Sequence, residues 1–355
     1  GGLAAGSSMV FFGASLALGP SRGHIAWHAA VVEVLYTMLL CFVFLNVCTS
    51  KKHADKDQFF GLAIGCVLVA GVSAAGHISG GCFNPAVAFG IDASNFQFIW
   101  FLIYSALQLL GAGLAATLYL VVRPDDFTTR PVDRYPLATK LTSEFIGAYM
   151  LVLTLGLNIL GRSPAASLAT AAGVTGMTFA LGSCSGAHFN PAVTLSVMAS
   201  GRAKCLPGEG SWYIFVQLLA GIAGAFTCAT LEGGKTFPLG PGPGFSWGAA
   251  GVVEVLFTFL LCYVYLCCFT TVIGLSQFYG LAIGGCVAAA GFLAGPISGG
   301  IVNPAAAAGI SLSHLTNGGG LLGLLLYTGA HLAGASLAAL TFMATHPTEY
   351  SKLPM

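Results

Sequence analysis

The 355-residue sequence predicts an all-α membrane protein, and three observations support this fold class. Hydrophobic residues make up 56% of the chain and charged residues only 7%, whereas a soluble domain carries about 25% charged residues. Six apolar runs reach the ~20 residues that a membrane-spanning helix needs. An Asn-Pro-Ala box occurs three times, each time shortly after a Ser-Gly pair. The apolar runs cover residues 25–49, 97–122, 139–160, 211–231, 247–271 and 319–344.

Composition also excludes several classes of function. The formal net charge is +1, so no basic face for nucleic acid is expected. Most of the eleven cysteines lie inside apolar runs and lack the spacing of a metal site or a disulfide framework. We therefore expect buried, reduced thiols that pack as small hydrophobic groups. No nucleophile–base set occurs in a coherent place, so the sequence predicts neither an enzyme nor a bound metal or cofactor.

The chain repeats itself at a fixed offset. Gln58 begins the segment QFFGLAIG and Gln277 begins QFYGLAIG, and Asn84 and Asn303 begin the boxes that follow. Both pairs are separated by 219 residues. A shorter echo at 143–195 carries SEFIGAYMLVL and then CSGAHFNPAVTL. This spacing predicts a unit of three spans and a short reentrant helix, used three times.

Each Asn-Pro-Ala box opens an apolar stretch that is too short to cross a bilayer alone (84–92, 190–198 and 303–311). Asparagine is a good helix N-cap and proline suits the first helical turn, so each box predicts a half-helix that begins at membrane depth. Two such helix ends that meet would place two amide donors and two positive dipoles in one passage, which suits water and opposes cations. The box residues are Asn84, Pro85, Ala86, Asn190, Pro191, Ala192, Asn303, Pro304 and Ala305.

With these motifs the sequence resembles the aquaporin or major intrinsic protein family over nearly its whole length. The segment SGAHFNPAVTL at 185–195 looks like the family's first-half box, and the two LAIG…SGG..NPA segments look like its second-half boxes. The resemblance implies right-handed bundles of tilted helices, six spans per protomer, one box from each half at the centre, and usually four protomers. It also implies that the early acids of three spans, Glu33, Glu144 and Glu254, are structural acceptors that hold the box loops.

On this resemblance, residues 139–345 form a complete aquaporin-like unit that contains the second and third boxes. Residues 1–122 are expected to be a partial unit, namely the end of a third span followed by a second half. Residues 123–138 link the two units, and 346–355 form a C-terminal tail. We expect the chain to be the downstream part of a tandem double channel whose upstream half is missing. The alternative is a genuine nine-and-a-half-span protein whose orphan half docks on another chain.

The distribution of basic residues predicts the orientation in the membrane. If the linker is cytoplasmic, ten Lys and Arg residues fall on its side of the membrane and three on the other. The linker and the C-terminus are therefore expected in the cytoplasm, whereas nothing in the sequence identifies which membrane holds the protein. The ten are Lys51, Lys52, Lys56, Arg123, Arg130, Arg134, Lys140, Arg202, Lys204 and Lys352, and the three are Arg22, Arg162 and Lys235.

The family has a second constriction outside the boxes, usually with an arginine directly after the second-half box, and this sequence lacks that arginine. Alignment by distance from the box asparagine places small or aliphatic side chains at the filter positions of both units. Loss of the cation and of bulky groups implies a wider passage with one barrier to positive charge removed. The positions are Thr170, Gly291, Gly300 and Ala306 in the complete unit, and Val72, Gly81 and Val87 in the partial unit.

These positions predict a passive channel for water or for small neutral solutes of the glycerol, urea, ammonia or hydrogen peroxide class. The alternative is that Phe179, Phe189 or Phe292 refills the space and leaves a non-conducting scaffold or a subunit of a larger membrane complex. Two tandem chains would supply a tetramer-like arrangement of four pores. His77 is expected to be a satisfied loop residue, and Cys82 to make the mouth of the partial unit sensitive to thiol reagents.

Overall fold

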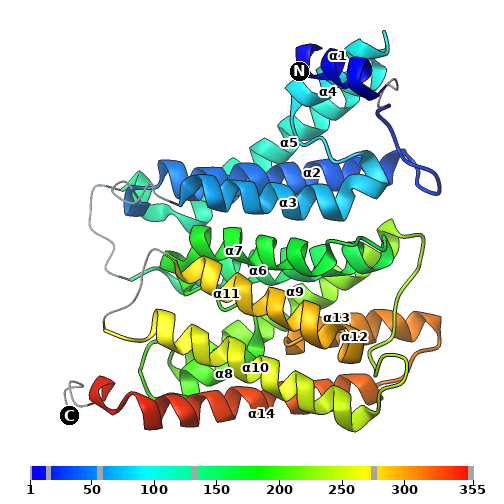
Figure 1. Ribbon diagram of the computed structural model, residues 1–355. Coiled ribbons are helices and arrows are strands. Elements are labelled where there is room, and N and C mark those ends of the chain that lie inside the picture. The colour runs from blue at the N-terminus through cyan, green and yellow to red at the C-terminus, as the bar shows by residue number, and fades with distance from the viewer. Residues whose placement is uncertain (1, 13–16, 54–58, 129–133, 273–277, 351–355) are drawn as a thin grey trace.

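The computed structural model of the chain describes residues 2–12, 17–53, 59–128, 134–272 and 278–350. Within these residues the regular structure is helical, and eight helices are long and apolar enough to cross a membrane (Figure 1). A ninth helix, α7, has 20 residues but a less apolar sequence. The nine are α2 (Ala26–Phe44), α3 (Phe60–Ser79), α5 (Ile99–Val122), α6 (Leu137–Leu160), α7 (Ala166–Ser185), α9 (Pro207–Leu231), α10 (Trp247–Phe269), α11 (Tyr279–Ala289) and α14 (Leu322–Thr345). A π-helical turn extends α2 to Thr49, and another, followed by α12 (Gly295–Ser298), extends α11.

These helices form three repeats of three spans, each with a half-helix between its second and third span. The half-helices begin at the proline of each box and are α4 (Pro85–Ser94), α8 (Pro191–Ala199) and α13 (Pro304–His314). The predicted all-α membrane fold is therefore confirmed. The six apolar runs of the sequence are α2, α5, α6, α9, α10 and α14, and the three second spans complete the repeat.

Helices α6 to α14 form one bundle around the second and third half-helices. In it α6 packs on α9, α10 packs on α14, and α7 and α11 lie side by side between these pairs (Figure 1). Half-helix α13 approaches α9 closely because glycines face each other at the contact. A Cβ on Gly309 would lie 2.2 Å from the Gly221 carbonyl oxygen, and a Cβ on Gly221 would lie 2.3 Å from that of Ala305. Small residues at such crossings are typical of helices that pack inside membranes.

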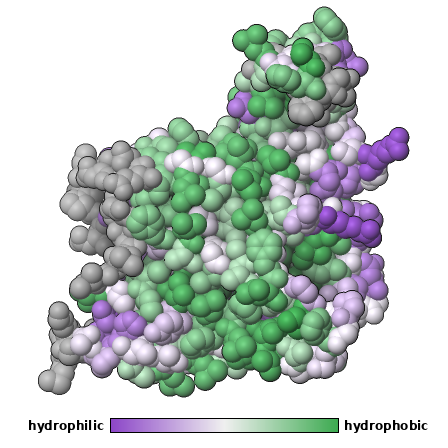
Figure 2. Space-filling view, in the orientation of Figure 1, coloured by the Kyte–Doolittle hydropathy of each residue, from purple (hydrophilic) through white to green (hydrophobic). Residues whose placement is uncertain are grey.

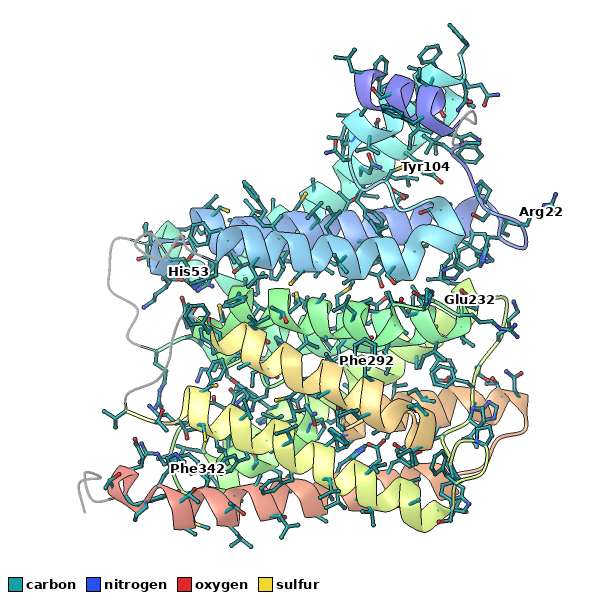
Figure 3. The ribbon with its side chains drawn as sticks, viewed as in Figure 1. Arg22, His53, Tyr104, Glu232, Phe292 and Phe342 are labelled. Atoms are coloured by element: carbon teal, nitrogen blue, oxygen red, sulfur yellow. The ribbon has the colours of Figure 1, made fainter. Side chains whose placement is uncertain are left out.

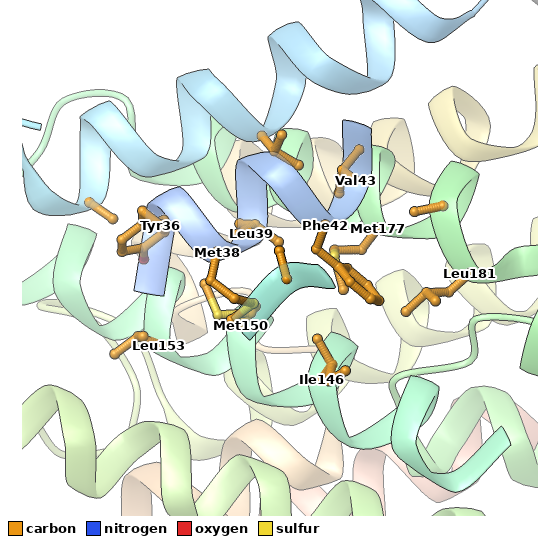
Figure 4. Close-up of a cluster of buried hydrophobic side chains, with 14 of the residues drawn as sticks. Tyr36, Met38, Leu39, Phe42, Val43, Ile146, Met150, Leu153, Met177 and Leu181 are labelled. Carbon is orange, nitrogen blue, oxygen red and sulfur yellow. The ribbon is translucent and has the colours of Figure 1, made fainter. Parts of the chain in front are cut away.

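The first repeat lies against one side of this bundle. Helices α2 and α3 pack on α6 and α7, whereas α4, the short α1 (Gly2–Phe12) and the far part of α5 lie beyond that contact (Figure 1). The contact is filled by a cluster of buried apolar side chains from both sides, which Figure 4 shows at close range. The cluster includes Tyr36, Met38, Leu39, Phe42, Val43, Ile146, Met150, Leu153, Met177 and Leu181.

Polar contacts also cross the same interface. The Tyr36 hydroxyl lies 3.0 Å from the Thr154 hydroxyl, and Ser73 donates to Asn158 Oδ1 at 2.6 Å. Near the linker, the fully buried Arg123 donates to the Ala180 carbonyl at 2.6 Å and to Asn46 Oδ1 at 2.8 Å. Because a buried guanidinium without partners is costly, Arg123 ties the end of α5 to both repeats, although the sequence placed it only as a charge on the linker side.

The surface agrees with a multi-pass membrane protein. Figure 2 shows apolar surface over the outward faces of the spans, with polar residues gathered at the ends of the helices. Helix α6 begins at Leu137, so the end of the predicted linker 123–138 is helical. The linker residues 129–133 and the tail residues 351–355, with Arg130 and Lys352, lie outside the described residues, as do Gly1 and Lys56.

The close contact of α3 with α7 yields a test of the inter-repeat packing. A Cβ on Gly176 would lie 2.5 Å from Val67 Cγ1 and 2.8 Å from the Ala63 carbonyl oxygen. Gly176→Ala is expected to lower the free energy of unfolding by about 1–3 kcal/mol, because overpacking forces the helices apart. Gly65→Ala is the control, since a Cβ there meets nothing within 4 Å. Thermal unfolding in detergent measures both variants, and equal melting temperatures would contradict this description of the contact.

Candidate functional site

The three box loops share one local structure, which begins where each second span ends. In the middle repeat, Gly186 terminates α7 in the left-handed conformation with φ +94°, which glycine adopts without strain. The preceding Ser185 accepts a hydrogen bond from the Ala187 N–H at 3.1 Å. The equivalent positions are Ser79, Gly80 and Gly81 in the first repeat and Ser298, Gly299 and Gly300 in the third. The Ser-Gly pair before each box is therefore a helix stop.

A buried carboxylate then binds each loop from the first span of the repeat. Glu144 accepts hydrogen bonds from the Ser185 hydroxyl at 2.6 Å and from the backbone N–H groups of His188 at 3.0 Å and Phe189 at 2.6 Å. Gln217 on α9 donates to the same carboxylate at 2.8 Å. Glu33 and Glu254 bind their own loops in the same way, with Gln108 and His331 in place of Gln217. In this structure all three carboxylates therefore accept hydrogen bonds from their box loops.

The third span of each repeat supplies a second support that sequence reasoning missed. Tyr213 donates to the Ser185 carbonyl at 2.9 Å, one turn before Gln217 on the same helix. The sequence does contain a signal for this support, because a tyrosine followed four residues later by Gln or His recurs on the third span of every repeat. The other pairs are Tyr104 with Gln108 and Tyr327 with His331, and Tyr104 and Tyr327 bond the carbonyls of Ser79 and Ser298.

The residue immediately before each box asparagine is held in a conformation that non-glycine residues rarely adopt. The φ angles are +50° at Phe83, +52° at Phe189 and +43° at Val302. Such backbone strain costs about 1–3 kcal/mol and persists only where the surroundings determine it. Here the carboxylate binds the N–H of that same residue in each loop. The strain turns the chain so that the following asparagine caps the half-helix.

The second and third boxes meet through their asparagines. Asn190 Oδ1 accepts from the Ala192 N–H at 2.8 Å, and its Nδ2 donates to the Val302 carbonyl at 2.8 Å. Asn303 makes the corresponding bond to the second box loop, where its Nδ2 donates to the Phe189 carbonyl at 3.0 Å. Each amide has two N–H donors, so one remains at the cavity wall. The first box is different: Asn84 caps α4 in the same way but is exposed.

Two adjacent cavities lie in this bundle, one of them at this meeting point. A central cavity of about 40 Å³ is lined by both paired asparagines, and a wider vestibule of about 330 Å³ is lined partly by Phe237, Pro238 and Leu239. The two share a ring of residues, which we call the constriction ring: Leu155, Thr170, Val287, Gly300 and Ile301. Apart from Thr170, this ring presents aliphatic side chains and glycine backbone. None of the described residues lining either cavity is Lys, Arg, Asp or Glu.

The structure places the predicted filter positions unevenly. Thr170, Gly291 and Gly300 line the vestibule together. Ala306 does not line either cavity and is fully buried in an apolar cluster that includes Val152. In the first repeat Val72 and Val87 are exposed, and Gly81 is buried next to Val72. Leu155, Val287 and Ile301 of the constriction ring were not identified from the sequence.

The three phenylalanines considered as space-fillers have separate locations. Phe189 lines the central cavity. Phe179 is buried between the repeats, where its ring stacks on Phe59 with centroids 4.6 Å apart. Phe292, labelled in Figure 3, is 56% exposed and lines neither cavity. Neither Phe179 nor Phe292 therefore lines the vestibule in this structure.

Comparison with known proteins adds the family context. The model of the family described as "Major intrinsic protein" matches residues 20–158 and 157–342. The chain is 32% identical to Aquaporin NIP1-1 of Zea mays over 189 residues, which are 50% of this chain and 65% of that protein. It is 33% identical to Glycerol uptake facilitator protein-like 6 of Lactiplantibacillus plantarum over 214 residues, which are 56% of this chain and 94% of that protein.

The matches to plant relatives are partial in length. Aquaporin NIP1-4 of Oryza sativa subsp. japonica is 33% identical and is matched over 54% of its length, so both plant proteins named here are matched over less than two thirds. Among solved structures, the aquaglyceroporin from Plasmodium falciparum has a TM-score of 0.53 at 20% identity. It matches 60% of this chain and 99% of its own. At this identity the likeness concerns the fold.

The carboxylate that holds the third box loop can be tested without touching the cavity. In Glu254→Gln an NH₂ group replaces one of the two acceptor oxygens. This donor then faces loop groups that also donate, so the free energy of unfolding should fall by about 1–3 kcal/mol. Glu209→Gln is the control, because Glu209 pairs with Lys140 at a partly exposed site, where such a pair contributes about 0.2–1 kcal/mol. Thermal unfolding measures both, and the assigned role fails if Glu209→Gln is the more damaging change.

Proposed function

The chain belongs to the major intrinsic protein family, and from this premise we propose that residues 139–345 form a passive channel for water and small neutral solutes. The observation that carries the proposal is the pairing of Asn190 and Asn303 around a cavity whose described lining contains no Lys, Arg, Asp or Glu. A neutral solute that donates and accepts hydrogen bonds can exchange its water partners for amide N–H groups and loop carbonyls there.

Charge exclusion follows from the same geometry. Half-helices α8 and α13 begin at the two asparagines, so both partially positive N-termini point at the central cavity. A cation would have to leave its hydration shell, pass apolar ring residues and then meet these two dipoles. A neutral molecule meets none of these electrostatic costs. The channel is therefore proposed to conduct uncharged molecules.

The solute class follows from the side chains at the outer end. Thr170, Gly291 and Gly300 leave the vestibule wide, and Ala306 adds no cation to it. A polyol or amide can enter such a vestibule, and the Thr170 hydroxyl offers one hydrogen-bond partner at the constriction ring. We therefore assign a widened, arginine-less filter to this channel, with water accompanied by solutes of the glycerol, urea, ammonia or hydrogen peroxide class.

The domain arrangement forms part of the same proposal. The first repeat is a second half without its partner, since Asn84 meets no second box among the described residues. Helix α1 lies against α4 as α9 lies against α13, so α1 corresponds to the end of a third span. The linker and the C-terminus lie on one side of the membrane, the cytoplasmic side by charge. Copies of the chain are proposed to associate so that the pores form a tetramer-like group.

Permeation through the constriction ring can be tested with proteoliposomes. Thr170→Phe places an aromatic ring between vestibule and central cavity, and stopped-flow swelling in water and glycerol gradients should fall to the level of empty liposomes. Val72→Phe, which introduces the same aromatic ring at an exposed position of the first repeat, should leave swelling unchanged. If the unaltered protein swells no faster than empty liposomes, the channel proposal is wrong and a non-conducting scaffold is favoured.

The assigned pore centre has its own test. Asn190→Asp combined with Asn303→Asp removes the N–H donors at the central cavity and adds two carboxyl groups, so swelling in both gradients should drop sharply. Asn84→Asp changes the exposed box asparagine of the first repeat and should have no effect on swelling. Unchanged permeability of the double variant, at equal protein incorporation, would mean that solutes do not pass between these asparagines.

A further inference from the structure

A cluster of two histidines and a glutamate lies between the first repeat and the channel bundle, at the end of the spans opposite the linker. His24 precedes α2, His77 lies in the last turn of α3, and Glu232 ends α9. Figure 3 shows Glu232 at the same edge of the molecule as Arg22, while His53 lies at the opposite edge. None of the three lines the central cavity or the vestibule, so the cluster is separate from the proposed pore.

The side chains of this cluster converge on one point. One ring nitrogen of each histidine and one carboxylate oxygen of Glu232 all lie within 4.8 Å of one another. His77 Nε2 is 2.6 Å from Glu232 Oε1. Ligands on a tetrahedral ion with bonds of about 2.0–2.1 Å lie roughly 3.3 Å apart, so small rotations of the three side chains suffice to surround an ion. A fourth position is open to water or to His28, whose Nδ1 is 3.4 Å from His24 Nδ1.

The residue types of the cluster suit metal ligation. Carboxylate and neutral imidazole are the forms that bind metals, and binding releases any proton that a ligand atom carries. The neighbouring cation, Lys235, is exposed to solvent.

The surroundings hold the ligands in place. Glu232 has a side chain only 3% exposed, and the His24 ring lies edge-on to the His77 ring with centroids 5.7 Å apart. The His77 ring lies directly against Gly161 at the end of α6, where an added Cβ would be 2.4 Å from His77 Cε1. Contacts of this kind, behind the ligand atoms, are what fix ligand orientation in metal sites.

We propose that His24, His77 and Glu232 bind a divalent transition metal of the Zn²⁺ class, which bridges the first repeat and the channel bundle. Imidazole nitrogen and carboxylate oxygen suit Zn²⁺, whereas Mg²⁺ and Ca²⁺ prefer oxygen alone. The ion takes the place of the hydrogen bond between His77 and Glu232, and the proton of that bond is released to solvent. The bound ion stabilises the contact between the first repeat and the channel bundle at the end of the spans opposite Arg123. From residue spacing we expected no metal site. On this proposal that expectation is wrong, because the ligands are far apart in the chain.

The test uses the purified full chain in detergent, stripped with a chelator and titrated with ZnCl₂, with MgCl₂ as the comparison ion. Zn²⁺ should raise the melting temperature progressively with concentration, and Mg²⁺ should not. Glu232→Gln and His24→Ala should each weaken Zn²⁺ binding by more than about tenfold, since changes even behind the ligands cost about 10–100-fold. His314→Ala removes a histidine that bonds Thr236 at the same edge and should bind Zn²⁺ as the unaltered protein does.

X-ray absorption at the zinc edge identifies the ligands directly. The proposal requires a shell of nitrogen and oxygen at about 2.0–2.1 Å, whereas a sulfur shell at about 2.3 Å would place the ion on cysteines and overturn it. Equal affinity of Glu232→Gln and the unaltered protein overturns it as well. Gly161→Ala displaces the His77 ring but leaves all three ligand side chains in the chain. It should therefore weaken Zn²⁺ binding without removing a ligand. These readouts are independent of permeation, and failure of the channel proposal would leave them unaffected.

Discussion

The structure depends on one constraint, namely that backbone N–H groups inside a membrane need acceptors. The three box loops place non-helical backbone at membrane depth, where each unsatisfied donor costs several kcal/mol. A buried glutamate meets this need in every repeat by accepting from two consecutive N–H groups and from the serine before them. The positive φ before each asparagine, the direction of each half-helix and the position of the amides all depend on that carboxylate.

The first repeat separates what a box needs from what a pore needs. Its loop has the same glutamate, the same turn and the same strained residue, Phe83, as the other two. Yet Asn84 caps its half-helix while remaining exposed, because no second box faces it among the described residues. The loop conformation is therefore determined within one repeat. The central cavity lies where Asn190 and Asn303 donate across to each other's loop.

Helix α7 connects the pore to the inter-repeat contact. One side of it contributes Thr170 to the constriction ring, and the other presents Gly176 and Phe179 to α3 and its neighbours. The small residues that make α7 less apolar than the other spans are therefore required by packing on two sides. The first repeat therefore packs against the side of α7 that faces away from the pore. Polar contacts of Arg123 at one end and of the cluster around Glu232 at the other stabilise this packing.

The sequence by itself determined the spans, the half-helices, the buried acids and the family, because these depend on local composition and on motifs a few residues long. Asn190 and Asn303 could be predicted as helix N-caps without coordinates, whereas the role of the Ser-Gly pair as a helix stop came from the structure. Only the tertiary structure decided that Ala306 is buried away from the vestibule, and that Tyr213 supports a loop. It also brought His24, His77 and Glu232 together. These outcomes depend on which helix faces meet, and residues distant in the chain become neighbours only when the spans have packed.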